Sequence, residues 1–509
     1  MIVDYMRWQA VPWGTCRVTS ALNREAVRIG MRNTLRFVCA VVFCVVSSSR
    51  TLAEEPWRFI VTGDSRGSDN GVNRVILDEL VVEILSRDVE FVLFSGDLVY
   101  GIASGAADEF ETQLRTWLRA TEPVYDANIG VYVCRGNHEL GDLYRSPLPG
   151  TDPNHNYAGR WLDIFGSDDY PDQKLPDNGP VGEKYMTYSV RHRNVFVACL
   201  DNYAGLGHSF VHRVNQRWLD LQLASNASPH VFLMGHEPAF RALPRSCLED
   251  HPADRDAFWM SIKNAGGRTY FCGHDHFYDH ARIDDGDGDP NNDVHQYIVG
   301  AGGAYPYTWS PPYNGDNTSY SPEQVAHAKA YGYVIVEIDD LDVTLTWMER
   351  DSLDLDVAGV YEPNEVWSYT VVPGLIIVSP NGGERLLVGD GHTISWSTIG
   401  GAEVQQVLIE YSLDEGRSWK QVDSWPNTGS YAWDSVPLVD SDECLIRISD
   451  LSDATLSDTS DDVFTIVPCE KHLAGDLNGD CYVDLRDLAI FMADWLDCGH
   501  PLDPSCSGL

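Results

Sequence analysis

Seven side chains in the first 280 residues could together hold metal ions and act on a bound substrate. They are Asp64, Asp97, Asn137, His138, His236, His274 and His276. Carboxylate, amide and imidazole groups form a donor set that suits Zn, Fe or Mn better than Ca. A transition-metal ion in such a set polarises a substrate and lowers the pKa of a bound water. These residues therefore indicate a metal-assisted reaction.

The seven residues belong to five short motifs, and each motif follows a hydrophobic run that is typical of a buried strand. The motifs are "GDSRG" at Gly63, "GDLVY" at Gly96, "GNHE" at Gly136, "GHEP" at Gly235 and "GHDH" at Gly273. The runs before them are Phe59–Thr62, Phe91–Phe94, Val131–Cys134, Val231–Met234 and Thr269–Cys272. Taken singly, a Gly-Asp pair is usually a turn. Because ligands of α/β sheets sit at the carboxyl ends of strands, we expect the five motifs to converge on one site.

Amphipathic helices separate these strands and set the fold class. Apolar residues at helical spacing follow the first motif, at Val72, Ile76, Leu80 and Ile84. Alternation of buried strands with such helices predicts an α/β domain over residues 54–372.

The five motifs in this order resemble the calcineurin-like metallophosphoesterase superfamily. The resemblance implies a four-layer αββα domain that binds two transition-metal ions (Fe, Zn or Mn) and hydrolyses a phosphoester with a metal-activated water. It implies that Asp97 bridges the ions, that Asp64 and His276 bind the first, and that the second has three ligands, Asn137, His236 and His274. His138 would face the substrate and stabilise the transition state or protonate the leaving oxygen. Monoester and diester substrates both stay open.

One position departs from the family pattern. Most members have His or Gln two residues after the first Asp, whereas this chain has Arg66, which cannot bind a metal because its guanidinium stays protonated. Tyr100 stands three residues after Asp97, a spacing that resembles the purple acid phosphatases, in which this tyrosinate binds ferric iron. Tyr100 is therefore a candidate ligand of the first ion. The alternative is an aromatic wall beside a weak or lost first site.

Residues 373–468 have a different hydrophobic pattern from the α/β region, without helical periodicity. Short alternating segments at His392–Ser397, Val407–Ser412, Cys444–Ser449 and Val463–Val467 are separated by turn signals, which predicts a β-sandwich. The segment "EYSLDEGRSW" within it resembles immunoglobulin-like or fibronectin type III-like modules of secreted enzymes. Such modules are common spacers, so this resemblance identifies no ligand.

Residues 469–509 form a third unit with the spacing of an EF-hand calcium loop. The oxygen ligands would come from Asp476, Asn478, Asp480, the carbonyl of Tyr482, Asp484 and Asp487. The loop and the helix after it, "GDLNGDCYVDLRDLAIFMADWL", resemble a dockerin type I repeat, which implies Ca2+ and a cohesin-like or cell-surface partner. Dockerins normally carry two repeats and a Gly where this chain has Cys481, so the chain departs from the dockerin pattern at two points.

The chain is strongly acidic, with 36 Lys and Arg against 76 Asp and Glu and a net charge of −40. Such a charge disfavours nucleic acids and anionic membranes, and no basic patch for nucleic acid is evident. Three carboxylates alternate in "DDGDGDPNND", at Asp285, Asp287 and Asp289. This spacing suits either a further calcium ion or a solvated acidic hairpin.

The N-terminus has the pattern of an export signal. A basic segment from Met31 to Arg36 precedes an apolar run from Phe37 to Val46, and Thr51–Ala53 offers a cleavage site after Ala53. We therefore expect residues 1–53 to be an extension plus signal peptide, with Met31 the initiator, and a secreted, periplasmic or surface protein without a membrane span after cleavage. Four cysteines near the C-terminus are the likeliest to form disulfides: Cys469, Cys481, Cys498 and Cys506.

Two functions compete on these observations. The first is a secreted phosphoesterase, of either monoesters or diesters. The second is a non-catalytic surface protein that keeps a relic domain and binds partners through its C-terminal modules. An intact metal set together with His138 favours the enzyme, because a relic is free to lose them.

Overall fold

The structure is a computed structural model that describes residues 55–101, 107–144, 157–203, 212–314, 320–437, 439–468, 474–475, 477 and 483–493. The predicted signal segment and the four C-terminal cysteines lie outside the described residues. Within these ranges, five buried cysteines carry free thiols: Cys134, Cys199, Cys247, Cys272 and Cys444. Among the helices in these ranges, none has both the length and the apolar character needed to cross a bilayer.

The first sheet is mixed and has six strands in the order β14-β13-β12-β1-β3-β4. Its strands are β1 (Trp57–Thr62), β3 (Phe91–Phe94), β4 (Gly130–Val133), β12 (Gly332–Asp339), β13 (Asp342–Arg350) and β14 (Tyr361–Thr370). Strands β1, β3 and β4 run parallel, while β12 pairs with β1 in the antiparallel sense. The three motif-bearing strands of this sheet therefore end at the same edge.

The second sheet has seven strands in the order β11-β9-β10-β8-β7-β6-β5. They are β5 (Tyr188–His192), β6 (Val195–Cys199), β7 (His230–Met234), β8 (Thr269–Cys272), β9 (Tyr278–Asp284), β10 (Val294–Val299) and β11 (Ser321–Ala328). Strands β6, β7, β8 and β10 are parallel neighbours, so β7 and β8 also end side by side.

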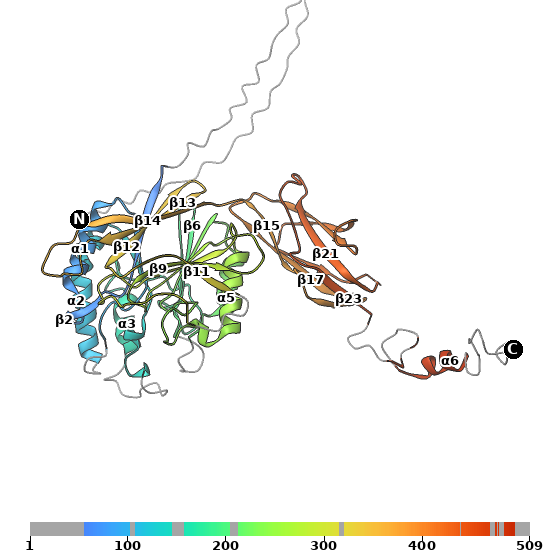
Figure 1. The fold of residues 1–509 in the computed structure, drawn as a ribbon, viewed down its shortest axis with the longest axis horizontal. Helices are drawn as coiled ribbons and strands as arrows, with labels where there is room; N and C mark the ends of the chain where they lie inside the picture. The colour runs from blue at the N-terminus through green and yellow to red at the C-terminus, as the bar shows by residue number, and fades with distance from the viewer. Residues whose placement is uncertain are drawn as a thin grey trace, which may run out of the picture. The chain divides into compact units, whose positions relative to one another are not determined.

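The two sheets share one core, and helices cover their outer faces (Figure 1). The rings of Phe59 on β1 and Phe232 on β7 lie 5.2 Å apart in an edge-on contact across the two sheets. Helix α1 (Arg74–Ser86) packs on the first sheet with α2 (Ala107–Asp126), whose Trp117 meets Phe94 of β3. On the second sheet, Trp259 of α5 (Pro252–Asn264) packs against Tyr270 of β8. The remaining elements of this region are β2 (Arg66–Asp69), α3 (Tyr157–Phe165), α4 (Gln216–Ala224) and the 3-10 turns Asn137–Tyr144 and Leu248–Asp250.

This arrangement is an α/β domain of mixed sheets, and the five predicted motif-bearing strands divide between its two sheets. Three belong to the first sheet and two to the second. Hydrophobic runs show that a strand is buried, and they do not show which strand it pairs with. The motifs nevertheless meet, because the two sheets face each other with their motif-bearing ends at the same side.

The C-terminal region is mostly β. A three-stranded sheet has the order β15-β17-β20, and a second sheet runs β16-β23-β21-β18-β19, with β22 paired to β21. The strands are β15 (Gly374–Ser379), β16 (Arg385–Leu387), β17 (His392–Ile399), β18 (Gln406–Ser412), β19 (Lys420–Pro426), β20 (Ser430–Trp433), β21 (Ser441–Asp450), β22 (Ser457–Thr459) and β23 (Phe464–Val467). Residues from both sheets, such as Trp396 and Ile446, fill one core. A short helix, α6 (Leu485–Ala493), follows.

A buried ion pair ties helix α1 to the first sheet. The guanidinium of Arg350, fully buried at the end of β13, donates to both oxygens of Glu79, at 2.7 and 3.0 Å. The hydroxyl of Tyr361 donates to the same carboxylate at 3.1 Å. This carboxylate therefore holds three elements together.

We expect Glu79→Ala to lower the free energy of unfolding by about 1–3 kcal/mol, because buried Arg350 would keep its carbonyl acceptors but lose its charged partner. The adjacent Asp78 is the matched control, since its pair with Arg74 lies at the surface. Asp78→Ala should change the free energy by no more than about 0.5 kcal/mol. Urea unfolding followed by tryptophan fluorescence measures both, and equal effects would contradict the assignment.

Candidate metal centre

The loops after the strands place the functional side chains through unusual backbone conformations. Asp64, Asp97 and His274 have φ angles of 58°, 48° and 69°, in the left-handed region that non-glycine residues rarely adopt. Three such residues at one site concentrate backbone strain there, as is common at functional sites. Gly96 itself has φ 97°, and a Cβ there would lie 2.7 Å from Nδ1 of His236.

One half of the site is formed by Asp64, Asp97 and His276. One ligand atom from each lies within 4.8 Å of the others, and all three residues are buried. Oδ1 of Asp64 accepts no hydrogen bond, although Oδ2 accepts the backbone N–H of His274 at 3.1 Å. A buried carboxylate oxygen without a donor is costly, and a bound cation would remove that cost. These residues fit a metal ion.

The other half is formed by Asp97, Asn137, His236 and His274. Oδ1 of Asn137 lies 2.9 Å from Nδ1 of His274 and 3.2 Å from Nε2 of His236, which in turn lies 3.4 Å from Oδ1 of Asp97. Nδ1 of His236 donates to the carbonyl of Ser95 at 2.7 Å, so its Nε2 carries a lone pair. The lone pairs of His236 Nε2 and Asn137 Oδ1 therefore face each other in a buried space. A cation between them would accept both.

Protonation equilibria agree with this donor set. Burial lowers the pKa values of His236, His274 and His276, so their imidazoles are neutral and can bind a metal. Burial would raise the pKa of Asp97, but its interactions with His138, His236 and Arg66 outweigh burial and lower that pKa. Burial and the charge of Asp97 raise the pKa of Asp64 well above its usual range. Keeping Asp64 as a carboxylate therefore costs free energy, and a cation beside it would offset that cost.

His138 lies beside the carboxylate of Asp97. Its backbone N–H donates to Oδ1 of Asp97 at 3.0 Å, and its Nδ1 donates to the carbonyl of Tyr100 at 2.6 Å. This leaves Nε2, 3.8 Å from Oδ2 of Asp97, turned toward the centre. The imidazole is 14% exposed, so a substrate can reach it.

Arg66 and Tyr100 meet at the edge of the centre. Nε of Arg66 lies 3.3 Å from Oδ2 of Asp97, and its Nη2 lies 3.0 Å from Nε2 of His276. The guanidinium lies 5.9 Å from the centroid of the Tyr100 ring, and that ring stands 5.5 Å from the imidazole of His138. Tyr100 is 42% exposed. Arg66 and Tyr100, the two residues singled out by their difference from most members of the family, therefore contact each other.

Glu139 is a positioning residue that the sequence interpretation missed. Its carboxylate accepts three backbone N–H groups, from Asp97 at 3.0 Å, Val99 at 3.2 Å and Gly136 at 2.7 Å. Burial and the charge of Asp97 raise its pKa to about 8, against the effect of the three donors. Glu139 thus joins the second and third motif loops. Its position in the motif "GNHE" is the feature of the sequence that could have indicated this role.

Asn202 was missed as well. Its Oδ1 accepts the backbone N–H groups of His236 and Glu237, at 2.8 and 2.9 Å, which fixes the fourth motif loop. Asn202 follows strand β6 with no glycine before it. Its position shortly after a buried strand is therefore the only feature of the sequence that could have indicated this role.

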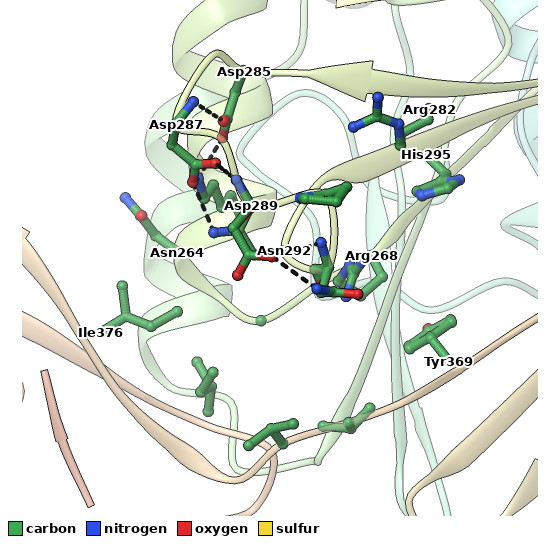
Figure 2. Close-up of a pocket in the computed structure, with 18 of the residues that line it drawn as sticks. Asn264, Arg268, Arg282, Asp285, Asp287, Asp289, Asn292, His295, Tyr369 and Ile376 are labelled. Atoms are coloured by element: carbon green, nitrogen blue, oxygen red, sulfur yellow. Dashed lines mark hydrogen bonds and ion pairs between the residues drawn. The ribbon is translucent and has the colours of Figure 1, made fainter. Parts of the chain in front are cut away.

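The three alternating carboxylates of the β9–β10 hairpin lie together (Figure 2). Backbone N–H groups of Asp287 and Asp289 donate to Oδ1 of Asp285 and Asp287, at 3.2 and 2.7 Å. The ammonium of Lys263 pairs with both Asp285 and Asp287. The ammonium of Lys263 therefore already supplies positive charge to this hairpin.

The predicted calcium loop lies mostly outside the described residues, which include neither Asp476, Asn478, Asp480 nor Tyr482. Asp487, at the last ligand position, is buried and accepts the backbone N–H groups of Leu477 and Asp484, at 2.7 and 2.8 Å. Asp487 therefore joins the segment at Leu477 to the start of helix α6.

Comparison with known proteins supports the resemblance. Residues 58–278, less than half of the chain, match the family model of the calcineurin-like phosphoesterases. The chain therefore contains a calcineurin-like metallophosphoesterase domain, which includes all seven candidate residues and their Asp/His cluster. This family typically binds two metal ions. A search of curated proteins found no match, and the identity of the β-rich C-terminal region is not assigned.

We expect Glu139→Gln to weaken metal binding and to destabilise the domain by about 1–3 kcal/mol, because an amide NH2 would face a backbone N–H that now has an acceptor. Thermal unfolding and calorimetric titration with Zn2+ measure the two effects. Glu122→Gln is the control, since Glu122 is exposed on α2. Unchanged zinc affinity in the Glu139 variant would contradict its positioning role.

Proposed function

We propose that this protein hydrolyses phosphate esters at a transition-metal centre. One observation carries the proposal: the carboxylate of Asp97 lies between two buried sets of donor atoms, with Nε2 of His138 beside it. Asn137, His236 and His274 would hold an ion on one side of Asp97, while Asp64 and His276 flank the other. The family of the domain supports the substrate class.

A bound metal ion would polarise the phosphoryl oxygens and lower the pKa of a water molecule. The protein's own groups do the rest. Buried walls exclude bulk water, the neutral imidazoles keep their lone pairs directed inward, and Asp97 keeps a negative charge where cations must sit. When protonated, His138 would present Nε2–H to stabilise charge on the phosphoryl group or to hand that proton to the leaving oxygen, because Nδ1–H already donates to the carbonyl of Tyr100.

We expect His138→Ala to lower kcat for a p-nitrophenyl phosphoester by about 10^2–10^4, with metal content unchanged, because His138 acts on the reacting group. His212→Ala serves for comparison, since His212 pairs with Glu237. That variant should keep kcat within about tenfold. Steady-state kinetics give kcat for each variant, and metal analysis shows whether its metal content has changed. A His138 variant with full kcat would remove this residue from the reaction.

Tyr100 has one of two roles, and a spectrum separates them. If it is a tyrosinate ligand of ferric iron, as the purple acid phosphatase resemblance implies, the protein shows a visible absorption band that Tyr100→Phe abolishes. If it supports the guanidinium of Arg66 through its ring, the variant keeps its spectrum and its metal content. The 5.9 Å contact between ring and guanidinium favours the second role.

The remaining parts of the proposal concern location and accessory modules. The pattern from Met31 to Ala53 supports export, to the periplasm, the cell surface or the medium. Two sheets around one core support an immunoglobulin-like or fibronectin-like spacer at residues 373–468. The EF-hand spacing from Asp476 to Asp487 supports a dockerin-like calcium loop, and with it a cohesin-like partner.

A phosphodiesterase of the same family and a non-catalytic surface protein are the alternatives. Assays of mono- and diester substrates with the metal-loaded protein separate the two enzymes. Asp97→Ala should abolish both metal binding and hydrolysis, because Asp97 serves both halves of the centre. Equal hydrolysis by wild type and variant would defeat the enzyme proposal and leave the surface protein.

A further inference from the structure

Arg66 occupies the space that a first metal ion would need. Its Nη2 lies 3.0 Å from Nε2 of His276 and 3.4 Å from the hydroxyl of Tyr307. Its Nε lies 3.3 Å from Oδ2 of Asp97, the oxygen on the side of the first ion. The side chain is 16% exposed, so the guanidinium lies inside the centre.

Nε2 of His276 can serve only one of the two cations. A neutral imidazole nitrogen has a single lone pair, and Arg66 has only donors to offer it. Nδ1 of His276 lies 3.3 Å from the carbonyl of Tyr305, which places the proton on that nitrogen and the lone pair on Nε2. Tyr307 stacks on the imidazole at 4.2 Å and holds the ring in this orientation.

The backbone holds Arg66 at this position. The hydroxyl of the preceding Ser65 donates to the carbonyl of Leu98 at 2.8 Å and accepts the indole N–H of Trp117 at 3.1 Å. Arg66 itself bridges to Val72 across the β2 hairpin. The guanidinium is therefore directed at the centre by a fixed main chain and has Tyr100 against one side.

We propose that Arg66 and a first metal ion exclude each other at His276. The resting protein then holds one transition-metal ion, bound by Asp97, Asn137, His236 and His274, and Arg66 supplies the positive charge of the other half. This inference rests on the proposed function, in which both halves face the substrate phosphate. A guanidinium suits that position because it can donate two parallel hydrogen bonds to a phosphate.

The charge of the site supports the exclusion. Arg66 and a divalent ion on the same side of Asp97 would repel each other at short range in a buried space. Oδ1 of Asp64 still accepts no hydrogen bond, so this carboxylate keeps the capacity to bind a cation. Removing Arg66 should therefore open the first site to an ion.

Metal content of the full-length protein tests the proposal. After equilibration with Zn2+ and desalting, elemental analysis should find one zinc per wild-type chain and two in Arg66→Gln and Arg66→His. His276→Ala should leave the wild-type value at one and return Arg66→Gln from two to one. His236→Ala should lose the wild-type ion. Arg241→Gln is the matched control, since Arg241 pairs with Asp250, and should keep one.

Two zinc ions in the wild type, or one in both Arg66 variants, would overturn the proposal, as would a His236→Ala protein that keeps its ion. Circular dichroism establishes that each variant is folded. The proposed function fails differently. A wild-type chain that holds one zinc ion and hydrolyses no phosphoester would contradict the proposed function but agree with the proposed role of Arg66. An active wild-type chain with two zinc ions would agree with the function and contradict the role of Arg66.

Discussion

The carboxylate of Asp97 is buried with few partners of its own, and both halves of the centre are built against it. Oδ1 accepts the N–H of His138 and faces His236, while Oδ2 faces Arg66. A charge so placed needs cations around it, because water cannot solvate it. The buried histidines around it stay neutral, so Arg66 is the charged partner beside it, and metal ions would add further positive charge.

The fold serves this carboxylate by bringing two sheets to one point. The first sheet supplies Asp64, Asp97 and the Asn137–His138 pair, and the second supplies the other histidines. Backbones must approach closely to bring these groups together, which explains the glycine that opens the third motif: a Cβ at Gly136 would lie 2.2 Å from Oδ1 of Asp97. Glu139 and Asn202 then hold the loops by their N–H groups, so the positions of the ligands depend on residues that never touch the substrate.

Much of this centre could be predicted from sequence because strand ends and metal-binding side chains both leave local signals. The strands Phe91–Phe94 and Thr269–Cys272 have the predicted bounds. Strand pairing leaves no such signal, which is why the division of the motifs between two sheets was not predicted. Glu139 and Asn202 escaped for a related reason: they bind backbone N–H groups distant in sequence, and the sequence does not show those partners. Arg66 was visible as a departure, but its contact with His276 required the structure.

Anomalous X-ray scattering from crystals grown with zinc is the most direct test of a metal centre at this place. The account predicts a zinc peak within bonding distance of Asp97, Asn137, His236 and His274. Absence of zinc there, in crystals of protein that binds zinc in solution, would contradict the account, because these buried lone pairs would then face each other without a cation.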